Sequence, residues 1–513
     1  KVIGSGEPLR LTSDPAVDDA PVWSPDGRWI AFVRRNRTDP RGDVYVIPAL
    51  GGVERKVGET VFSNQFYGPT LAWTSDSKWL AMRDDSRSIP GLYLISVETK
   101  EMRLLVEWTG KKQTDRGAAF SADGRRLAFC RSGGLYVLEL EGLKPKGEPR
   151  QLISDENAVL GSPAWSPNQQ DIVFQRRQSV TTATLWRVRA EGGQNPSAIP
   201  NTGISAFDPA VSGSGLLAYT DRLYDSNIWR LPLHGAGVSA GPPIRLIASS
   251  RSDSSMAPSP DGRYVAFASS RTGSLQIWVA HSDGSLQVQL THYPEGFVGS
   301  PRWSPDSSLI AYDTVLNGHK DIYVVPVDGG SSTRFTNTGG NMLPAWSADG
   351  KWIYFSSDRE DGRDIWKKPY SGGAEVRVTH NGGVAARESP DGKFFSYFSA
   401  VGGNLWLMPL RAGVPDEGQK RLVRDRANIL AFDVSTTGIY FGEWVSFGEV
   451  GSLKGSRSET LYFYDFATGR TRIIASIAKP PSIGLSVSGD ERWLLFSQVD
   501  VAGSDLMLMD GFQ

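Results

Sequence analysis

Residues 344–379 read PAWSADGKWIYFSSDREDGRDIWKKPYSGGAEVRVT and contain four short apolar runs separated by turn-forming residues. The segment SADG at 347–350 suits a tight turn, because Asp is tolerated at the third position and Gly accepts a left-handed backbone at the fourth. β-branched and aromatic residues fill the flanking runs, as is typical of strands. We therefore expect four antiparallel strands: A before the turn, B after it, C around residues 364–366, and D ending at Thr379.

Related turns, among them Ser24-Pro25-Asp26-Gly27, recur along the whole chain. Their third residues stand at positions 26, 76, 123, 168, 214, 261, 306, 349, 391, 437 and 490, which gives eleven units of about 46 residues. Four short antiparallel strands per unit, repeated around an axis, match the blades of a β-propeller. We expect an all-β fold, a β-propeller with eleven four-stranded blade repeats, whose recurring tryptophans fill the core between blades.

Eleven blades exceed the usual four to eight of one ring, so the sequence favours two propellers in tandem. We expect the first in residues 1–250 and the second, with about six blades, in residues 251–513. Residues 2–12 match residues 325–336, the end of strand C and strand D, so the first blade lacks three strands. Either that blade is truncated and the rings meet near residue 250, or the N-terminal strand completes the last blade.

Composition excludes several classes of function. Lys plus Arg is 55 against 56 for Asp plus Glu, which leaves no basic surface for nucleic acid or an anionic membrane. Cys130 is the single cysteine, and the five histidines form no H-x-x-x-H pair, so we expect no disulfide, no metal site and no cofactor. No apolar run is long enough to cross a bilayer, and any anchor or export signal is expected upstream of Lys1.

The Trp-Ser-Pro-Asp-Gly units, the Asp-Ile-Tyr or Asn-Ile-Trp strand and the Arg-Leu-Thr ending resemble the TolB-type, WD40-like propeller repeat (PD40). The same repeat occurs in the propellers of dipeptidyl-peptidase IV and tricorn-type peptidases. The run of units, including the ending SDLML at 504–508, looks most like the extracytoplasmic part of bacterial membrane-anchored winged-helix or kinase regulators. This resemblance implies a sensing or partner-binding segment on the periplasmic or extracellular side of the inner membrane.

Charged residues in strand A are the first candidates for ligand contact, because this strand lines the channel of a propeller. They are Arg116, Arg302, Arg387, Glu388 and Asp433. A channel-facing charge has to be paired or solvated, so these residues predict either a polar binding surface or an internal set of salt bridges. The balance favours the salt bridges.

A second candidate group consists of Asp18 and Asp19, which we expect in a loop between strand D and the next strand A, at one mouth of the channel. A solvated loop is the simpler interpretation, and a ligand or cation site is the alternative.

Three functions are compatible with such a chain. The first is a non-catalytic binding module that presents a channel mouth to a protein partner or a small ligand. The second is the substrate-gating propeller of a dipeptidyl-peptidase IV-like or tricorn-like serine peptidase, although no Gly-x-Ser-x-Gly nucleophile elbow is present. The third, a propeller lyase, needs clustered histidines, and the five histidines are dispersed. We expect the binding module.

Overall fold

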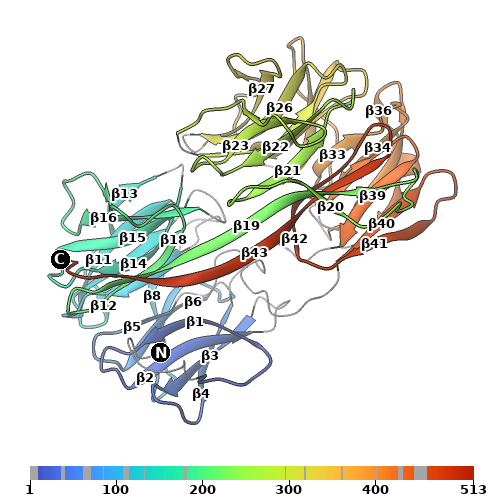
Figure 1. The fold of residues 1–513 in the computed structure, drawn as a ribbon. Helices are drawn as coiled ribbons and strands as arrows, with labels where there is room; N and C mark the ends of the chain where they lie inside the picture. The colour runs from blue at the N-terminus through green and yellow to red at the C-terminus, as the bar shows by residue number, and fades with distance from the viewer. Residues whose placement is uncertain are drawn as a thin grey trace. The chain divides into compact units, whose positions relative to one another are not determined.

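The computed structural model describes residues 10–512 except 36–40, 62–70, 85, 108–114, 132, 156–157, 178–181, 295, 317–318, 360–361, 400–402, 426–430 and 444–458. Strands make up nearly all the regular structure of these residues, and the only helical element among them is the short 3-10 turn η2 (Glu417–Gln419) (Figure 1). The expected all-β class is confirmed. Within the described residues, no helix is long and apolar enough to cross a membrane.

The chain forms two compact units. Unit 1 comprises Lys1–Arg222 and Ser504–Gln513, and unit 2 comprises Leu223–Gly503. This division differs from the expected boundary at residue 250. The reason lies in two long strands, β19 (Leu217–Pro232) and β43 (Trp493–Met509), each of which contributes its two halves to different units.

Unit 1 is built from successive antiparallel sheets. They are β1 (Val17–Trp23), β2 (Trp29–Arg35), β3 (Arg41–Pro48) and β4 (Arg55–Val61); β5 (Leu71–Trp73), β6 (Trp79–Asp84), β7 (Gly91–Ser96) and β8 (Met102–Glu107); β9 (Asp115–Phe120), β10 (Arg126–Arg131), β11 (Gly134–Glu141), β12 (Lys144–Pro145) and β13 (Arg150–Ser154); and β14 (Val159–Trp165), β15 (Asp171–Arg177), β16 (Ala183–Arg189) and β17 (Ser197–Ala198). In addition, β18 (Ala206–Val211) pairs with the first half of β19.

Unit 2 repeats the same plan. Its sheets are β21 (Asp253–Pro258), β22 (Tyr264–Ser269), β23 (Gln276–His281) and β24 (Val288–Gln289); β25 (Phe297–Trp303), β26 (Leu309–Leu316), β27 (His319–Pro326) and β28 (Thr333–Arg334); β29 (Asn341–Trp346), β30 (Trp352–Arg359), β31 (Gly362–Pro369) and β32 (Val376–Arg377); β33 (Val384–Glu388), β34 (Phe394–Phe398), β35 (Leu405–Arg411), β36 (Val414–Pro415) and β37 (Arg421–Arg424); and β38 (Phe432–Val434), β39 (Gly438–Glu443), β40 (Glu459–Asp465) and β41 (Thr471–Ile477).

A further sheet of unit 2 combines strands from the two ends of that unit. The first half of β43 pairs with β42 (Pro481–Val487), and the second half of β19 pairs with β20 (Ile244–Ile247). The two halves are neighbours in the sheet, and the backbone N–H of Leu233 donates to the carbonyl of Arg492 at 2.8 Å. The order β42, β43, β19, β20 therefore reproduces strands A to D with a break in the chain between B and C.

The first strands of the sheets in unit 2 contact one another in a closed cycle. The cycle runs β21, β25, β29, β33, β38, β42 and back to β21. In unit 1, the first strands β1, β5, β9, β14 and β18 contact one another in that order. In unit 2 the first strand of each sheet is thus its innermost one.

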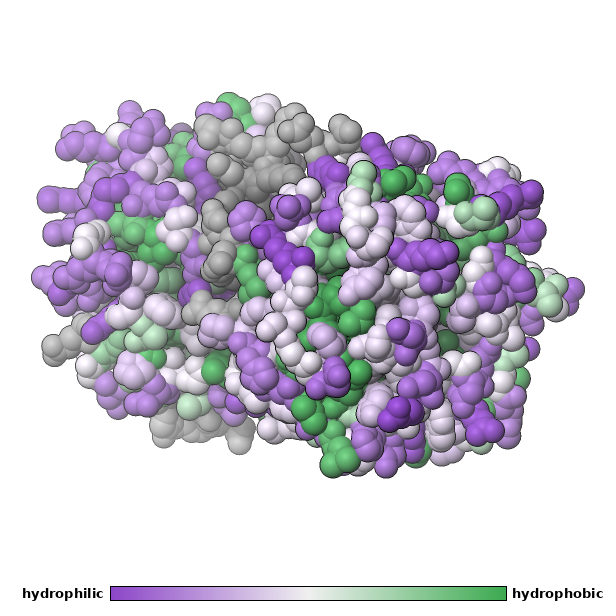
Figure 2. Space-filling model, turned by 90° about the horizontal axis from the view of Figure 1, so that it is seen from above, coloured by the Kyte–Doolittle hydropathy of each residue, from purple (hydrophilic) through white to green (hydrophobic). Residues whose placement is uncertain are grey.

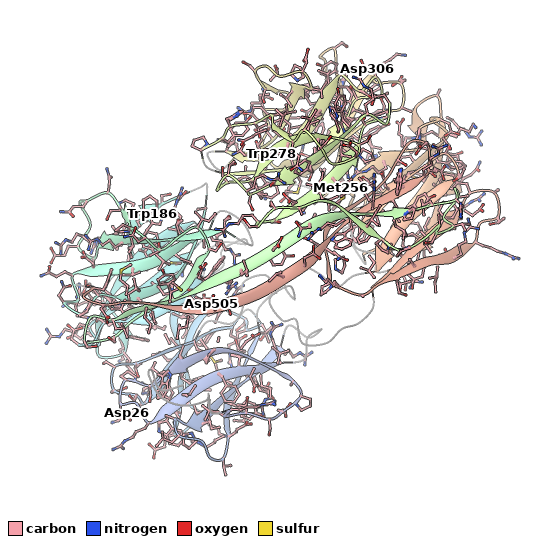
Figure 3. All side chains as sticks on the ribbon, viewed as in Figure 1. Asp26, Trp186, Met256, Trp278, Asp306 and Asp505 are labelled. Atoms are coloured by element: carbon pink, nitrogen blue, oxygen red, sulfur yellow. The ribbon has the colours of Figure 1, made fainter. Side chains whose placement is uncertain are left out.

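Hydrogen bonds within each A–B turn explain the recurring Ser and Asp. The Ser24 hydroxyl donates to Asp26 Oδ1 at 2.5 Å, and the same carboxylate oxygen accepts from the Arg28 backbone N–H at 3.1 Å. These bonds lower the pKa of Asp26. The same arrangement surrounds Asp306, and Figure 3 shows both aspartates. The expectation that these aspartates bond their own turns is confirmed.

A second recurring set of hydrogen bonds, here called the lock, joins the start of strand C to the end of strand D. The Thr379 hydroxyl donates to Asp364 Oδ1 at 2.8 Å and accepts from the Ile365 backbone N–H at 2.9 Å. Arg377 donates to the other Asp364 oxygen at 2.5 Å. The sheet of β25 to β28 repeats this lock around Asp321. The lock accounts for the paired Asp-Ile-Tyr and Arg-Phe-Thr motifs of the sequence.

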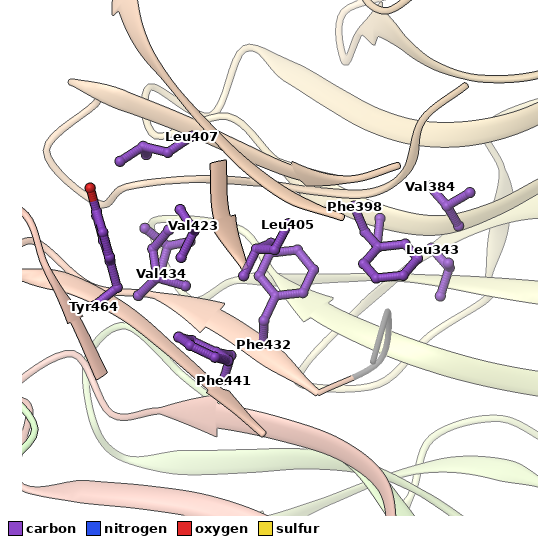
Figure 4. Close-up of a cluster of buried hydrophobic side chains, with 12 residues drawn as sticks. Leu343, Val384, Phe398, Leu405, Leu407, Val423, Phe432, Val434, Phe441 and Tyr464 are labelled. Atoms are coloured by element: carbon purple, nitrogen blue, oxygen red, sulfur yellow. The ribbon is translucent and has the colours of Figure 1, made fainter. Parts of the chain in front are cut away.

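The core lies between adjacent sheets. Figure 4 shows one cluster, in which Phe398 and Leu405 of one sheet pack against Phe432 and Phe441 of the next. Polar side chains are spread over much of the face drawn in Figure 2, with hydrophobic patches among them.

Tryptophans at the end of strand A form hydrogen bonds between neighbouring sheets. The indole N–H of Trp303 donates to the Ala257 carbonyl of the preceding sheet at 2.8 Å, and Trp165 makes the equivalent bond to Ala119 at 2.9 Å. Trp23 of the first sheet is 60% exposed. The expected burial of recurring tryptophans therefore fails at Trp23.

The lock predicts that replacing the Thr379 hydroxyl by a methyl group lowers the stability of the protein. We expect Thr379→Val to lower the free energy of unfolding by about 1–3 kcal/mol, because it leaves the buried Ile365 N–H without its acceptor. Equilibrium unfolding in urea measures the change. Thr333→Val, on the exposed strand β28, is the matched control and should stay within about 0.5 kcal/mol of the parent. Equal stability of the two variants would contradict the lock.

Candidate functional site

The site is formed by residues of the first strands in unit 2. The residue two positions before each turn serine is Ala257, Arg302, Ala345, Arg387, Asp433 or Ser486, in the order of the cycle. Arg302 on β25 and Arg387 on β33 are separated by β29 in this cycle. The positive charge of Arg302 nevertheless helps to lower the pKa of Arg387, and the negative charge of Asp433 on β38 acts to raise the pKa of both arginines. Arg387 Nε lies 3.8 Å from Asp433 Oδ1, and Arg302 occupies the equivalent position on β25, another inner strand of the same cycle.

Arg387 is a buried cation with an incomplete set of partners. Its side chain is 11% exposed, its Nη1 donates to the Ala386 carbonyl at 2.7 Å, and its guanidinium lies 5.6 Å from the centre of the Phe432 ring. Its Nε is buried and has no hydrogen-bond partner among the described residues. Burial, together with the nearby positive charge of Arg302, lowers the pKa of Arg387 to about 9, and Asp433 opposes the shift.

Arg302, like Arg387, has an incomplete set of hydrogen-bond partners. Its Nη1 donates to the Pro301 carbonyl at 2.9 Å, and its buried Nε has no hydrogen-bond partner within the described part of the chain. Burial lowers the pKa of Arg302, while the charges of Asp433 and Asp313 act in the opposite direction.

The nearby carboxylates accept hydrogen bonds from backbone N–H groups, and Asp313 Oδ1 is buried without a hydrogen-bond partner among the described residues. Asp433 accepts from the backbone N–H of Val434 at 3.1 Å and from that of Val487 at 3.0 Å, one bond to each oxygen. Asp313, on β26, accepts from the Leu343 backbone N–H at 2.9 Å, and burial raises its pKa. Sequence reasoning missed Asp313, although a carboxylate inside the apolar run LIAYD at 309–313 was the signal that could have found it.

Glu388 does not join this group. Its carboxylate accepts from the Tyr354 hydroxyl at 2.6 Å and from the Ala348 backbone N–H at 2.8 Å. Successive side chains of a strand point to opposite faces, so Arg387 and its neighbour Glu388 serve different surroundings. Glu388 connects its own sheet to the sheet before it, and its charge and hydrogen bond help burial to raise the pKa of Tyr354.

Asp18 and Asp19 lie in strand β1 rather than in the expected loop. Asp18 pairs with Arg34 at 2.7 Å, and Asp19 pairs with Arg35 at 2.7 Å, both across β1 and β2. Glu54 completes the set by accepting from Arg34 at 2.5 Å. These carboxylates belong to unit 1 and form salt bridges there.

The remaining sequence candidate is Arg116. It lies in β9, and its side chain is outside the described residues. In the described part of the chain, no group of three or more His, Cys, Asp or Glu side chains is arranged to hold a metal ion.

Comparisons with known proteins agree with the repeat pattern. A family model for the TolB beta propeller domain matches residues 287–413. The uncharacterized protein Atu1656 of Agrobacterium fabrum is 33% identical over 212 residues, which cover 40% of this chain and 68% of that protein. The chain belongs to the TolB-type β-propeller family.

Two proteins named TolB or TolB homolog are also similar to the chain. The Protein TolB homolog of Chlorobaculum tepidum is 25% identical over 131 residues, which cover 26% of this chain and 29% of that protein. The crystal structure of TolB from Acinetobacter baumannii aligns over 76% of this chain and 81% of its own, with 13% identity and a TM-score of 0.37.

The placement of Glu388 predicts a structural role for this residue. We expect Glu388→Ala to lower the free energy of unfolding by about 1–3 kcal/mol, because the Tyr354 hydroxyl and the Ala348 N–H lose their acceptor. Urea unfolding measures the loss. Glu417→Ala, an exposed carboxylate in η2, is the control and should change stability little. The interpretation fails if the two variants are equally stable.

Proposed function

We propose that the chain is a non-catalytic propeller module that binds a protein partner or a small ligand at the inner face of unit 2. The observation that carries this proposal is the pair Arg302 and Arg387, which occupy equivalent positions on inner strands of a closed cycle. Each has a buried Nε without a hydrogen-bond partner among the described residues. Largely buried cations of this kind are costly for folding unless they are paired, so their retention favours a role in binding.

We further propose that the two units are two propellers. Five of the eleven turns, at positions 26 to 214, belong to unit 1, and six, at positions 261 to 490, belong to unit 2. The closed cycle of first strands supports a six-bladed ring in unit 2. Its sixth blade takes strands A and B from β42 and β43, and strands C and D from β19 and β20, which closes the ring with both ends of the unit.

The wider context is part of the same proposal. Membership of the TolB-type family supports a place on the periplasmic or extracellular side of the inner membrane. The role as the sensing part of a larger membrane-anchored regulator rests on the resemblance of the repeat units alone. A gating propeller of a serine peptidase remains the alternative function predicted from the sequence.

A capture experiment with a matched variant tests the function. The immobilised chain is exposed to cell-envelope extract and to its small-molecule fraction at moderate salt, and retained species are identified by mass spectrometry. We expect at least one species to be retained by the parent and by Glu417→Ala, but to be lost from the double variant Arg302→Gln/Arg387→Gln. Identical retention by all three proteins would overturn binding at the inner face of unit 2.

A further inference from the structure

The donors of Arg302 and Arg387 exceed the acceptors that the described residues offer them. A guanidinium carries five N–H groups in a planar fork. Each of the two arginines gives one hydrogen bond to a neighbouring carbonyl, that of Pro301 or that of Ala386, and leaves its buried Nε–H unpaired.

The surrounding carboxylates do not supply the missing hydrogen-bond acceptors. Arg387 Nε lies 3.8 Å from Asp433 Oδ1, which is longer than a hydrogen bond, and both Asp433 oxygens already accept from backbone N–H groups. Among the described residues, Arg302 has no carboxylate within salt-bridge distance. Burial raises the pKa of Asp313, and no hydrogen bond joins this carboxyl to Arg302 in the described residues.

Five other partly buried arginines of this chain each donate directly to a carboxylate. They are Arg34 with Asp18, Arg176 with Asp155, Arg271 with Asp253, Arg334 with Asp321, and Arg377 with Asp364. Arg302 and Arg387 make no such bond in the described part of the chain, and the positive charge of Arg302 helps to lower the pKa of Arg387. Arg230 also leaves a buried Nε unpaired, but it lies on β19 and not on one of the first strands of the cycle. One negative group placed between Arg302 and Arg387 would satisfy donors of both and offset their positive charges.

We propose that Arg302 and Arg387 together bind the oxyanion group, a carboxylate or a phosphate, of a small ligand. This assignment rests on the proposed function and gives its ligand a chemical class. Planar guanidinium forks match both groups through paired N–H···O bonds, so the two arginines supply charge and geometry together. The Asp433 carboxylate lies 3.8 Å from Arg387 Nε, too far for a hydrogen bond, so this N–H stays available to the ligand.

Isothermal titration calorimetry on the whole chain tests this assignment. Inorganic phosphate and succinate are titrated separately, with sodium chloride keeping the ionic strength constant. We expect saturable binding of at least one probe, and the stronger probe identifies the source of the oxyanion. Arg302→Gln and Arg387→Gln should each weaken that binding roughly tenfold to a hundredfold, because each removes charge-assisted hydrogen bonds.

The control is Arg492→Gln, which removes an exposed arginine beside Asp490 and should bind as the parent does. If a Gln variant does not fold, Arg387→Lys keeps the charge but loses the fork, and it should still bind more weakly than the parent. No saturable binding of either probe, or equal affinity in parent and variants, would overturn the assignment. Arginine-dependent capture of a ligand together with silent probes would overturn the oxyanion class and leave the proposed function standing.

Discussion

Apolar packing between adjacent sheets is the interaction on which the rest of this structure depends. A four-stranded sheet has two faces, and each face has to be covered by another sheet to bury its side chains. Clusters such as Phe398 and Leu405 against Phe432 and Phe441 supply that cover. A fully buried side chain of this size contributes about 1.5–3 kcal/mol, so repeated clusters outweigh the polar locks within each sheet. The locks determine the register of strands within a sheet. The apolar packing between sheets brings the first strands of neighbouring sheets into contact.

The local structure was predictable because it follows from chemistry within one repeat. The turn at Asp26 and the lock between Asp364 and Thr379 involve residues close in sequence, so their spacing repeats and can be recognised. The unit boundary was not predictable in the same way. It depends on the pairing of β19 with β43, as in the bond from Leu233 to Arg492, 259 residues later in the chain, and no local pattern encodes such pairing.

The same distinction applies to the candidate site. Sequence position correctly singled out Arg302, Arg387 and Asp433 as inner-strand charges, because strand A could be recognised in each repeat. It also grouped Glu388 with them, although alternation along the strand places this side chain against Tyr354. Asp18 and Asp19 were misplaced because their cross-strand partners, Arg34 and Arg35, could be identified only with the register of β1 and β2 in hand.

The central claim is that the Nε–H groups of Arg302 and Arg387 are available to a ligand, and NMR of the arginine side chains observes these groups directly. Spectra of the ¹⁵N-arginine-labelled chain would be recorded without and with phosphate, and the two signals would be assigned from Arg302→Lys and Arg387→Lys. The account predicts that these two Nε–H signals shift together on titration while the signal of Arg377, bonded to Asp364, stays in place. Unchanged signals for Arg302 and Arg387, or uniform shifts of all arginines, would contradict it.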